Sequence, residues 1–301
     1  MIILILAGGY GRRLAPLTDY HAKSLLSVVG RPIIEWTLDK LPSEKILIST
    51  NRRFLDSFKE WIGNRAMELV CEETTREEEK LGAVGGLLYT IRKKRIDEPV
   101  LVVNGDNLFD FSLKDFLESD SAVNLLYDIK DVEEVKGKYG NALMEDGFIV
   151  QFLEKPQNPV SSLVSTGIYY FPPPTFRLIE EFYQDPTKDT DNMGSLLKWM
   201  TEEEKIKIKG VIKEGIWIDI GSKDSYIHAN QIFSGKNSFI ETSTRLKNST
   251  VKSSVILKGS TIVDSSLEGC IIDEDCLLEG VEFRDTIIGK GSRIVKTNTR
   301  Q

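Results

Sequence analysis

Short runs of apolar residues alternate with longer mixed segments over residues 1–233. The runs are continuous Ile, Leu and Val stretches, which is typical of strands buried on both faces of a sheet. Stretches with apolar residues near helical spacing lie between the first of these runs. This order predicts an α/β fold: a Rossmann-like, mostly parallel sheet covered by helices. We expect strands at 1–6, 45–49, 99–103, 123–127, 149–152, 167–171 and 206–211, and helices at 33–40, 53–62 and 83–92.

The stretch 144–156 has a different pattern. Asp146 and Gly147 stand between two extended segments, and an Asp-Gly pair in that position is a strong hairpin signal. We therefore expect an antiparallel hairpin here.

Composition changes near residue 234, which predicts a first domain at 1–233 and a second at 234–301. Beyond Ser234 there is no Trp, Pro, His or Tyr, and a six-residue period begins. Apolar residues every sixth place favour a β-helix of two to four coils of roughly 18 residues, with a set of β-hairpins as the alternative. The expected columns are Val251, Leu257 and Val263; Ser254, Ser260 and Ser266; and, after an offset near Gly269, Ile272 with Leu278 and Ile288 with Ile294.

Charge and cysteine content narrow the function classes. The 301 residues carry a net charge of −7, which argues against a general nucleic-acid or membrane-surface binder. Three cysteines and two histidines are too few for a disulfide framework or a histidine-rich metal site. No apolar run approaches the roughly 20 residues that a membrane span needs. We expect a cytoplasmic protein.

Glycines directly follow the first predicted strand, and basic residues follow the glycines. Glycines in this position let the backbone approach a ligand and present N–H groups to phosphate oxygens. Their spacing is neither the dinucleotide fingerprint nor a P-loop. The cations suit a triphosphate and its leaving pyrophosphate, although solvated surface arginines are the alternative. The segment contains Gly8, Gly9, Gly11, Arg12, Arg13 and Lys23.

Two aspartates follow apolar strands at positions suited to a metal ion. Asp106 comes after the strand at 99–103, and Asp219 follows an alternating Ile-Trp-Ile stretch. The carboxyl ends of strands in an open parallel sheet form the ligand crevice, and carboxylates there hold Mg²⁺ through oxygen. Turn or helix-capping aspartates are the alternative interpretation of both.

A third group of polar residues ends or opens later strands. Glu154 and Lys155 end one strand, where lysine can receive a phosphate monoester and glutamate can accept from sugar hydroxyls. Thr166 and Gly167 open the next strand as a polar edge. An ordinary surface Glu-Lys pair is the alternative.

Taken together, these stretches resemble the sugar-1-phosphate nucleotidyltransferases, also named NDP-sugar pyrophosphorylases. The resemblance covers residues 1–233 and extends to the tail, which is similar to the left-handed β-helix of that family. The motifs that carry it are LAGGYGRRLAPLT (6–18) with Lys23, KLGAVGGL (80–87), NGDNLFD (104–110), EKP (154–156), STGIY (165–169) and WIDIGS (217–222).

The resemblance implies a role for each matched residue. The nucleotide-binding set would be Leu6, Ala7, Gly8, Gly9, Gly11, Arg13, Lys80, Gly82 and Gly105. The sugar-phosphate-binding set would be Gly140, Glu154, Lys155, Thr166 and Gly167. The cofactor would be Mg²⁺, held by Asp106 and Asp219. The catalytic set would be Arg13, Lys23, Asp106 and Lys155.

The chain departs from the family pattern at a few positions. Arg12 stands where threonine is usual, and Lys80 stands where many members have glutamine. Ala83-Val84 replaces Thr-Ala in the segment expected to lie by the base. Residues 191–200 resemble an Asp-x-x-Gly segment, for which we expect sugar-side or lid packing.

The implied activity joins a nucleoside triphosphate to a sugar-1-phosphate. The first expectation is dTTP or UTP with glucose-1-phosphate; the alternatives are GTP with mannose-1-phosphate, or a non-catalytic regulatory subunit. A bifunctional enzyme with acetyl transfer is excluded because the tail has no histidine to act as a base. For the tail we expect assembly or allosteric control, and hence a homo-oligomer.

Overall fold

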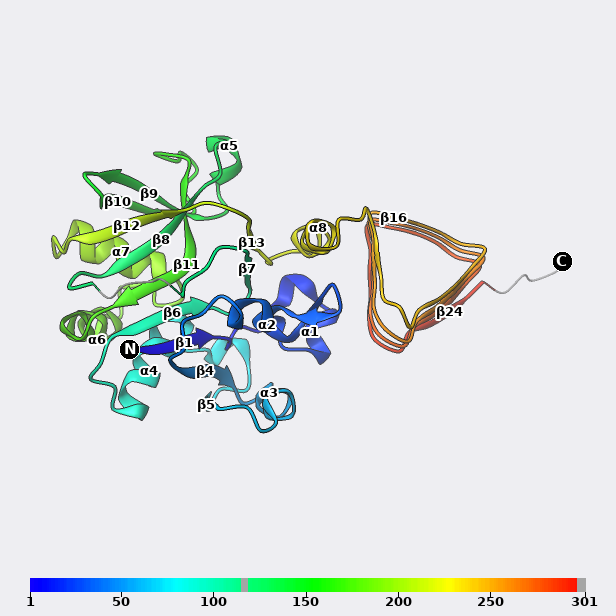
Figure 1. The fold of residues 1–301 in the computed structure, drawn as a ribbon, viewed down its shortest axis with the longest axis horizontal. Helices are drawn as coiled ribbons and strands as arrows, with labels where there is room; N and C mark the ends of the chain where they lie inside the picture. Colours follow the sequence, from blue (N-terminus) through cyan, green and yellow to red (C-terminus); the bar gives the residue numbers. More distant parts are fainter. Residues whose placement is uncertain (115–118, 297–301) are drawn as a thin grey trace. The chain divides into compact units, whose positions relative to one another are not determined.

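The structure, a computed structural model, describes residues 1–114 and 119–296. The chain forms two compact units (Figure 1): Met1–Gly9 with Thr37–Trp217, and Tyr10–Trp36 with Ile218–Gln301. The last helix before the repeat tail ends at Ser234, and the domain boundary at 233/234 stays a prediction. The last five residues of the predicted second domain, 297–301, lie outside the described residues.

Within the described residues, no helix has both the length and the apolar character that crossing a bilayer requires. The described helical segments lie between residues 12 and 234. They are η1 (Arg12–Leu14), α1 (Leu17–Tyr20), η2 (Lys23–Leu25), α2 (Ile33–Leu38), α3 (Leu55–Ile62), η3 (Glu77–Glu79), α4 (Gly82–Lys94), α5 (Val132–Val135), η4 (Pro173–Thr175), α6 (Phe176–Gln184), α7 (Met193–Glu202) and α8 (Lys223–Ser234).

The strands before the repeat tail are β1 (Ile2–Leu6), β2 (Ser27–Val28), β3 (Arg31–Pro32), β4 (Lys45–Asn51), β5 (Met67–Glu72), β6 (Val100–Asn104), β7 (Asn107–Phe109), β8 (Val123–Asp128), β9 (Gly140–Glu145), β10 (Phe148–Glu154), β11 (Leu163–Phe171), β12 (Ile208–Lys213) and β13 (Trp217–Asp219). Those of the tail are β14 (Phe239–Ile240), β15 (Arg245–Lys247), β16 (Thr250–Lys252), β17 (Val255–Ile256), β18 (Thr261–Val263), β19 (Ser266–Glu268), β20 (Ile271–Ile272), β21 (Leu277–Glu279), β22 (Glu282–Arg284), β23 (Ile287–Ile288) and β24 (Arg293–Val295).

The first unit is built on a large mixed sheet, which confirms the predicted fold class. In the described residues this sheet has nine strands in the order β5-β4-β1-β6-β11-β8-β12-β10-β9. The strands β5, β4, β1 and β6 are parallel, as expected for continuous apolar runs. Beyond β6 the sheet is mixed, because β11 runs antiparallel to both β6 and β8. The predicted hairpin is β9–β10.

Three helices of the first unit cover one face of this sheet. Their apolar side chains form a single buried cluster with those of β1, β4 and β6. Leu4 and Val102 come from the strands, Leu87 from α4, Phe182 from α6 and Leu196 from α7. Packing of this cluster holds the start of α4 close to the end of β1. Residues of both line the cavity described below.

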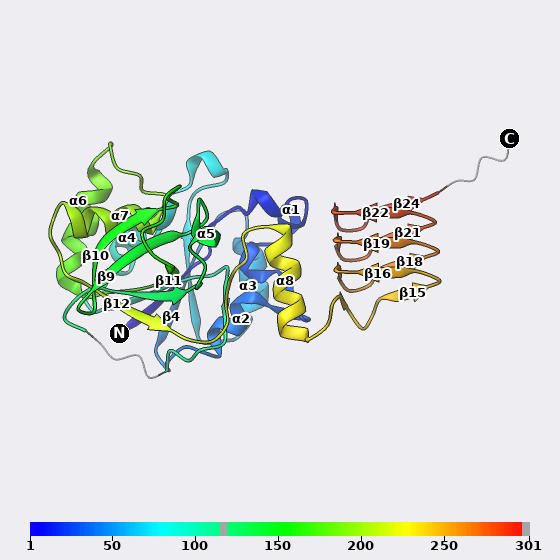
Figure 2. The same ribbon diagram turned by 90° about the horizontal axis from the view of Figure 1, so that it is seen from above.

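The second unit ends in a three-sided parallel β-helix, which confirms this prediction over a set of hairpins. Figure 1 shows its triangular section and Figure 2 its stacked coils. Within the described residues, β14, β17, β20 and β23 stack on one side, β15, β18, β21 and β24 on the next, and β16, β19 and β22 on the third. The corners hold residues with positive φ, among them Asn248, Asp264 and Gly280.

The repeat has a shorter period than the sequence pattern indicated. Hydrogen bonds between neighbouring coils join residues 16 apart, rather than roughly 18. The interior cluster contains Ile256 and Ile262 in place of Leu257 and Val263, so the predicted column of Val251, Leu257 and Val263 is wrong beyond Val251. Because two sides of the coil are shortened, the pairing stacks Val251 on Leu267 and Ile256 on Ile272.

The serine column shifts for the same reason. Ser254, Ser260 and Ser265 are buried at corners and accept backbone N–H groups of the next coil, whereas Ser266 is exposed. A serine at these corners satisfies a buried amide without adding bulk.

Candidate active site

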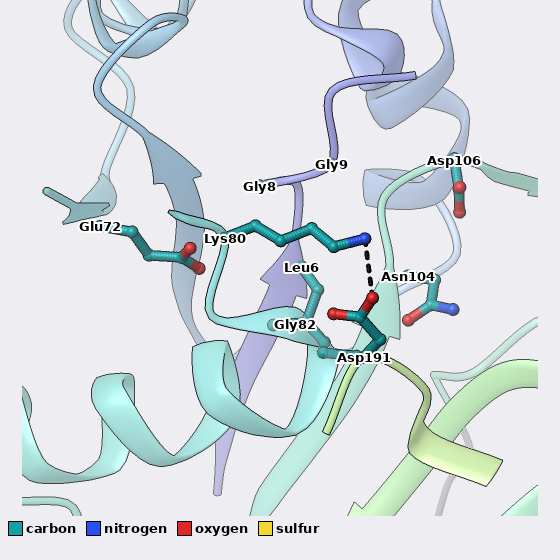
Figure 3. A pocket seen from close by; sticks show the side chains of 10 residues that line it. Leu6, Gly8, Gly9, Glu72, Lys80, Gly82, Asn104, Asp106 and Asp191 are labelled. Carbon is teal, nitrogen blue, oxygen red and sulfur yellow. Dashed lines mark ion pairs between the residues drawn. The ribbon is translucent and has the colours of Figure 1, made fainter. Parts of the chain in front are cut away.

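The first unit contains a cavity at the carboxyl ends of β1 and β6, named here the β1–β6 cavity. Its volume is about 230 Å³. Figure 3 shows that its lining side chains come from strand ends, the start of α4 and the segment before α7. The lining residues are Leu6, Gly8, Gly9, Glu72, Lys80, Gly82, Ala83, Asn104, Asp106 and Asp191.

Sheet topology explains why the cavity lies here. Leu6 of β1 is paired with Ser49 of β4 on one side and with Asn104 of β6 on the other. The sheet thus grows in opposite directions from β1, and open α/β sheets bind ligands at such a switch point. The chain turns are held by backbone bonds from Ala7 to Ser49 (2.8 Å) and from Gly105 to Leu6 (2.9 Å). The backbone amides of Ala7 and Gly105 therefore fix the turns after β1 and β6, whereas Leu6 lines the cavity itself.

The α4 end of the cavity joins two segments far apart in the sequence. Lys80 Nζ lies 2.9 Å from Asp191 Oδ2, and the amide of Ala83 donates to the Asp191 carbonyl at 3.1 Å. Gly82 has a φ of +73°, and a Cβ there would lie 2.7 Å from the Asp191 Cα and collide with the Thr190 carbonyl. Glycine at position 82 thus allows the 190–191 backbone to reach the first amides of α4.

Glu72, at the end of β5, is a carboxylate of the cavity that the sequence analysis missed. Its side chain is 5% exposed, and Ser49 Oγ donates to its Oε1 at 2.9 Å. Burial raises the pKa of Glu72 above its ordinary value of 4.5, while the hydrogen bonds from Ser49 and the Leu81 backbone lower it in part. A Cβ at Gly86 would lie 2.8 Å from Glu72 Oε1. Glycine therefore makes the space in which this carboxylate sits.

Asp106 faces the same cavity from the end of β6. Asn107 Nδ2 donates to Asp106 Oδ1 at 3.3 Å, and Asn104 lies beside it in the lining. Gly167, with a φ of +75°, packs against both asparagines: a Cβ there would lie 2.6 Å from Asn104 Nδ2. Thr166 is fully buried, and its hydroxyl donates to the Leu125 carbonyl at 2.9 Å. The hydroxyl of Thr166 therefore bonds within the sheet.

Glu154 and Lys155 lie at the end of β10, close to the start of α7. The Glu154 carboxylate occupies space left by two glycines, since a Cβ at Gly194 would collide with its Oε2 and one at Gly140 would lie 3.2 Å away. Burial raises the pKa of Glu154, and neighbouring Lys155 lowers it in part. Lys155 is exposed, 3.4 Å from that carboxylate.

The second unit holds the remaining predicted site residues. Arg13 and Asp219 both lie beside Gly221. A Cβ at Gly221 would lie 2.9 Å from Arg13 Nη2 and 3.3 Å from Asp219 Oδ2. Thr18 Oγ1 donates to the Gly11 carbonyl at 3.0 Å, and a Cβ at Gly11 would lie 3.5 Å from the Lys23 Cβ. The segment from Gly11 to Lys23 therefore folds back on itself, with Arg13 next to Asp219. The pairing of Asp106 with Asp219 on one metal ion stays a prediction.

The fold and the site together define a class of protein. A family model described as nucleotidyl transferase matches residues 2–235. The chain belongs to this family, which confirms the resemblance to the sugar-1-phosphate nucleotidyltransferases.

Similar proteins carry names from the same group. A protein of Methanocaldococcus jannaschii named bifunctional protein GlmU is 29% identical over 244 residues, which are 78% of this chain and 55% of that one. Mannose-1-phosphate guanylyltransferase 1 of Arabidopsis thaliana is 27% identical over 98% of this chain and 83% of its own. The chain spans little more than half the length of several of the curated relatives it matches.

A solved structure shows the same fold. It is a Bacillus anthracis protein named provisionally as a glucose-1-phosphate thymidylyltransferase, in complex with sucrose. The TM-score is 0.66 at 24% identity, and the match covers 77% of this chain and 95% of that one.

Proposed function

We propose that the protein transfers a nucleotidyl group from a nucleoside triphosphate to a sugar-1-phosphate, releasing pyrophosphate. An oxygen of the sugar-1-phosphate attacks the α-phosphorus, a new P–O bond forms, and the bond from the α-phosphorus to the oxygen bridging to the β-phosphate breaks. The electron pair leaves on pyrophosphate. The observation that carries the proposal is the β1–β6 cavity, at the switch point of a sheet of this family and lined by Gly8, Gly9 and Asp106.

The attacking phosphate is already an anion, so the reaction needs no general base. Its barrier comes from bringing two anions together and from the charge on the leaving group, so positioning and charge neutralisation dominate. Lys155 would hold the sugar-1-phosphate, and Glu154 would accept from sugar hydroxyls. Arg13 and Lys23 would stabilise the departing pyrophosphate, as the family resemblance implies.

Mg²⁺ is the cofactor of this proposal, with Asp106 and Asp219 as its protein ligands. The residues present fit the ion, because the Asp106 carboxylate lines the cavity beside the side chain of Asn104, and both offer the oxygen ligands that Mg²⁺ prefers. Mg²⁺ is usually bound by one or two carboxylates together with substrate phosphates. When bound, it would neutralise charge on the phosphates.

Guanine is the base that this cavity favours. The Watson–Crick edge of guanine offers two neighbouring donors, N1–H and N2–H₂, and one acceptor, O6. The Glu72 carboxylate has lone pairs beyond those used by Ser49 and the Leu81 backbone, and Lys80 brings a donor into the same cavity. Uracil and thymine present one N–H between two carbonyl oxygens, which a carboxylate would repel. Glu72 and Lys80 therefore support GTP over UTP or dTTP.

Mannose-1-phosphate is the sugar substrate of the proposal. The Arabidopsis relative, which this chain covers over 83% of its length, is named for that sugar and for guanylyl transfer. Glucose-1-phosphate with UTP or dTTP is the second candidate, because the similar fold from Bacillus anthracis carries that type of name.

A matrix of pyrophosphate release tests the proposal. Purified protein is assayed with GTP, UTP, dTTP, ATP and CTP against mannose-1-phosphate and glucose-1-phosphate, with Mg²⁺ and with EDTA. We expect the highest kcat/KM for GTP with mannose-1-phosphate, and no release in EDTA. Release with dTTP or UTP alone would replace the guanine assignment, and no release with any pair would favour the regulatory-subunit alternative.

A further inference from the structure

Asp273 is a buried carboxylate of the β-helix. Hydrogen bonds within the β-helix compensate only part of the cost of burying it. Asp273 follows β20 and is 0% exposed. Its Oδ1 accepts the backbone N–H of Glu274 at 2.7 Å, whereas its buried Oδ2 has no hydrogen-bond partner among the described residues. A buried carboxylate is costly unless a charge or several donors compensate it. A partner should therefore lie outside the coil.

The imidazole of His21, from the N-terminal segment, faces Asp273. His21 Nε2 lies 3.5 Å from Asp273 Oδ1, and this nitrogen is itself buried without a hydrogen-bond partner among the described residues. The buried Nε2 of His21 thus faces a buried carboxylate whose Oδ1 has one backbone donor and whose Oδ2 has none among the described residues. When His21 is protonated the two form an ion pair, which offsets part of the cost of burying the carboxylate.

Asp273, which faces His21, and Gly289, which lies by Pro16, occupy equivalent positions on successive coils of the β-helix. Residues 16 apart occupy equivalent corners, and Gly289 lies one coil beyond Asp273. A Cβ at Gly289 would lie 3.0 Å from Pro16 Cγ. One coil before Asp273 stands Leu257, which is buried. The coils thus pack closely against residues 16–21, and glycine at 289 permits that approach.

Helix α8 forms hydrogen bonds with residues 27–29, which follow in the same N-terminal segment. The Tyr226 hydroxyl donates to the Ser27 carbonyl, and Asn230 Oδ1 accepts the amide of Val29 at 2.9 Å. His21 lies within the folded loop from Gly11 to Lys23, two residues before Lys23 and ahead of these anchors in the sequence. Because Thr18 bonds to Gly11, a displacement of residues 18–21 would displace the backbone that carries Arg13 and Lys23.

We propose that Asp273 is a positioning residue: through His21 it fixes the segment that carries Arg13 and Lys23, so that the β-helix acts on the reaction from within its own chain. The consequence for catalysis rests on the proposed function, in which these cations contact the triphosphate and the leaving pyrophosphate. Lys155 belongs to the other unit, so sugar-1-phosphate binding should not depend on this contact.

Single and double variants test the coupling. Asp273→Asn keeps the shape and an acceptor for Glu274, and His21→Gln keeps a polar donor without the charge. We expect each to lower kcat/KM for the nucleotide by about tenfold to a hundredfold, the range that displaced catalytic groups produce. KM for the sugar-1-phosphate should stay within twofold, and the double variant should be no worse than the poorer single one. Asp264→Asn, an exposed corner of the same β-helix, should match wild type.

A second readout does not depend on activity. Amide hydrogen exchange of residues 10–36 should increase in Asp273→Asn and in His21→Gln, whereas exchange of residues 100–104 in β6 should not. If wild type shows this coupling but releases no pyrophosphate, the proposed function fails and the positioning contact stands. Wild-type exchange and wild-type kcat/KM in both single variants would overturn the proposal, as would additive losses in the double variant.

Discussion

The ammonium of Lys80 lies 2.9 Å from the carboxylate of Asp191, and both side chains line the β1–β6 cavity. Their side chains are 34% and 46% exposed, so the pair contributes only about 0–1 kcal/mol to stability. In the proposed function, Asp191 would compete with the nucleotide base for the Lys80 ammonium.

Asp191→Asn should reveal this competition. Because Lys80 loses its carboxylate partner, we expect KM for GTP to fall by up to about fivefold, the equivalent of about 1 kcal/mol, with a melting temperature close to wild type. Steady-state kinetics and thermal unfolding measure the two quantities. Glu203→Gln breaks the exposed ion pair of Lys188 outside the cavity lining and should leave KM unchanged. A rise in KM for Asp191→Asn would instead assign its carboxylate a direct contact with the nucleotide.

Glu72→Gln should change the choice of base. The amide offers one acceptor and one donor, which suits the N3–H and a carbonyl of uracil or thymine better than the two donors of guanine. A good bidentate base contact discriminates by about 1–3 kcal/mol, so the ratio of kcat/KM for GTP to that for UTP should fall by about 5- to 150-fold. Competition assays with both nucleotides measure this ratio. An unchanged ratio would remove Glu72 from base recognition.

The same substitution should change the pH dependence of stability. The pKa of Glu72 is raised by burial, so the folded protein holds this proton more tightly than the unfolded chain does. As pH rises from 4.5 through the raised pKa, the free energy of unfolding of wild type should lose this contribution. Glu72→Gln should therefore be the more stable protein at pH 7 to 8, with the difference vanishing below pH 4.5. Urea unfolding at several pH values measures it, and equal stability at neutral pH would contradict the prediction.

Strands with continuous apolar runs could be predicted from the sequence. A strand whose apolar run is interrupted could not, and neither could the site residue at its end. β1 is a pure apolar run and β6 is apolar up to its last residue, Asn104, so the glycines and Asp106 after them were found as strand-end residues. β5 was missed because Glu68 interrupts its apolar pattern, and Glu72 at its end was missed with it. The rule that strand ends line the crevice applies equally to Glu72, but it requires the strand to be recognised first.

Contacts between segments distant in the sequence could not be predicted from local pattern. Nothing in the sequence around Asp191 shows that its backbone bonds to Ala83, or that Asp273 faces His21. The β-helix was predicted from its period, but the period counted along the sequence missed the shortened sides of each coil. Register depends on where the corners fall, and the buried serines at those corners became identifiable only from their bonds to the next coil.

Gly82→Ala should damage the cavity more than an equally strained glycine elsewhere. Gly82 and Gly147 both have positive φ, at +73° and +81°, so an alanine is strained at either position. At Gly147 a Cβ meets nothing within 4 Å, whereas at Gly82 it collides with the 190–191 backbone. We expect Gly147→Ala to cost about 1–2 kcal/mol and to retain activity, and Gly82→Ala to cost more and to raise KM for GTP. Urea unfolding and kinetics of the two variants measure the difference, and equal losses would contradict the close packing at Gly82.

Asp106→Asn tests the metal role of the cavity carboxylate. The amide keeps the shape and one oxygen acceptor for Asn107, so the melting temperature should stay near wild type. The lost charge should lower kcat by about a hundredfold to a thousandfold, the range found when one group that stabilises transition-state charge is removed. It should also raise the Mg²⁺ concentration for half-maximal release of pyrophosphate, because one anionic ligand is gone. Asp146→Asn, in the turn between β9 and β10, gives the same change of charge at a hairpin and should behave as wild type. Wild-type kcat with a wild-type Mg²⁺ requirement in Asp106→Asn would show that this carboxylate holds no catalytic ion, and the ligand set would then have to be sought elsewhere than at the end of β6.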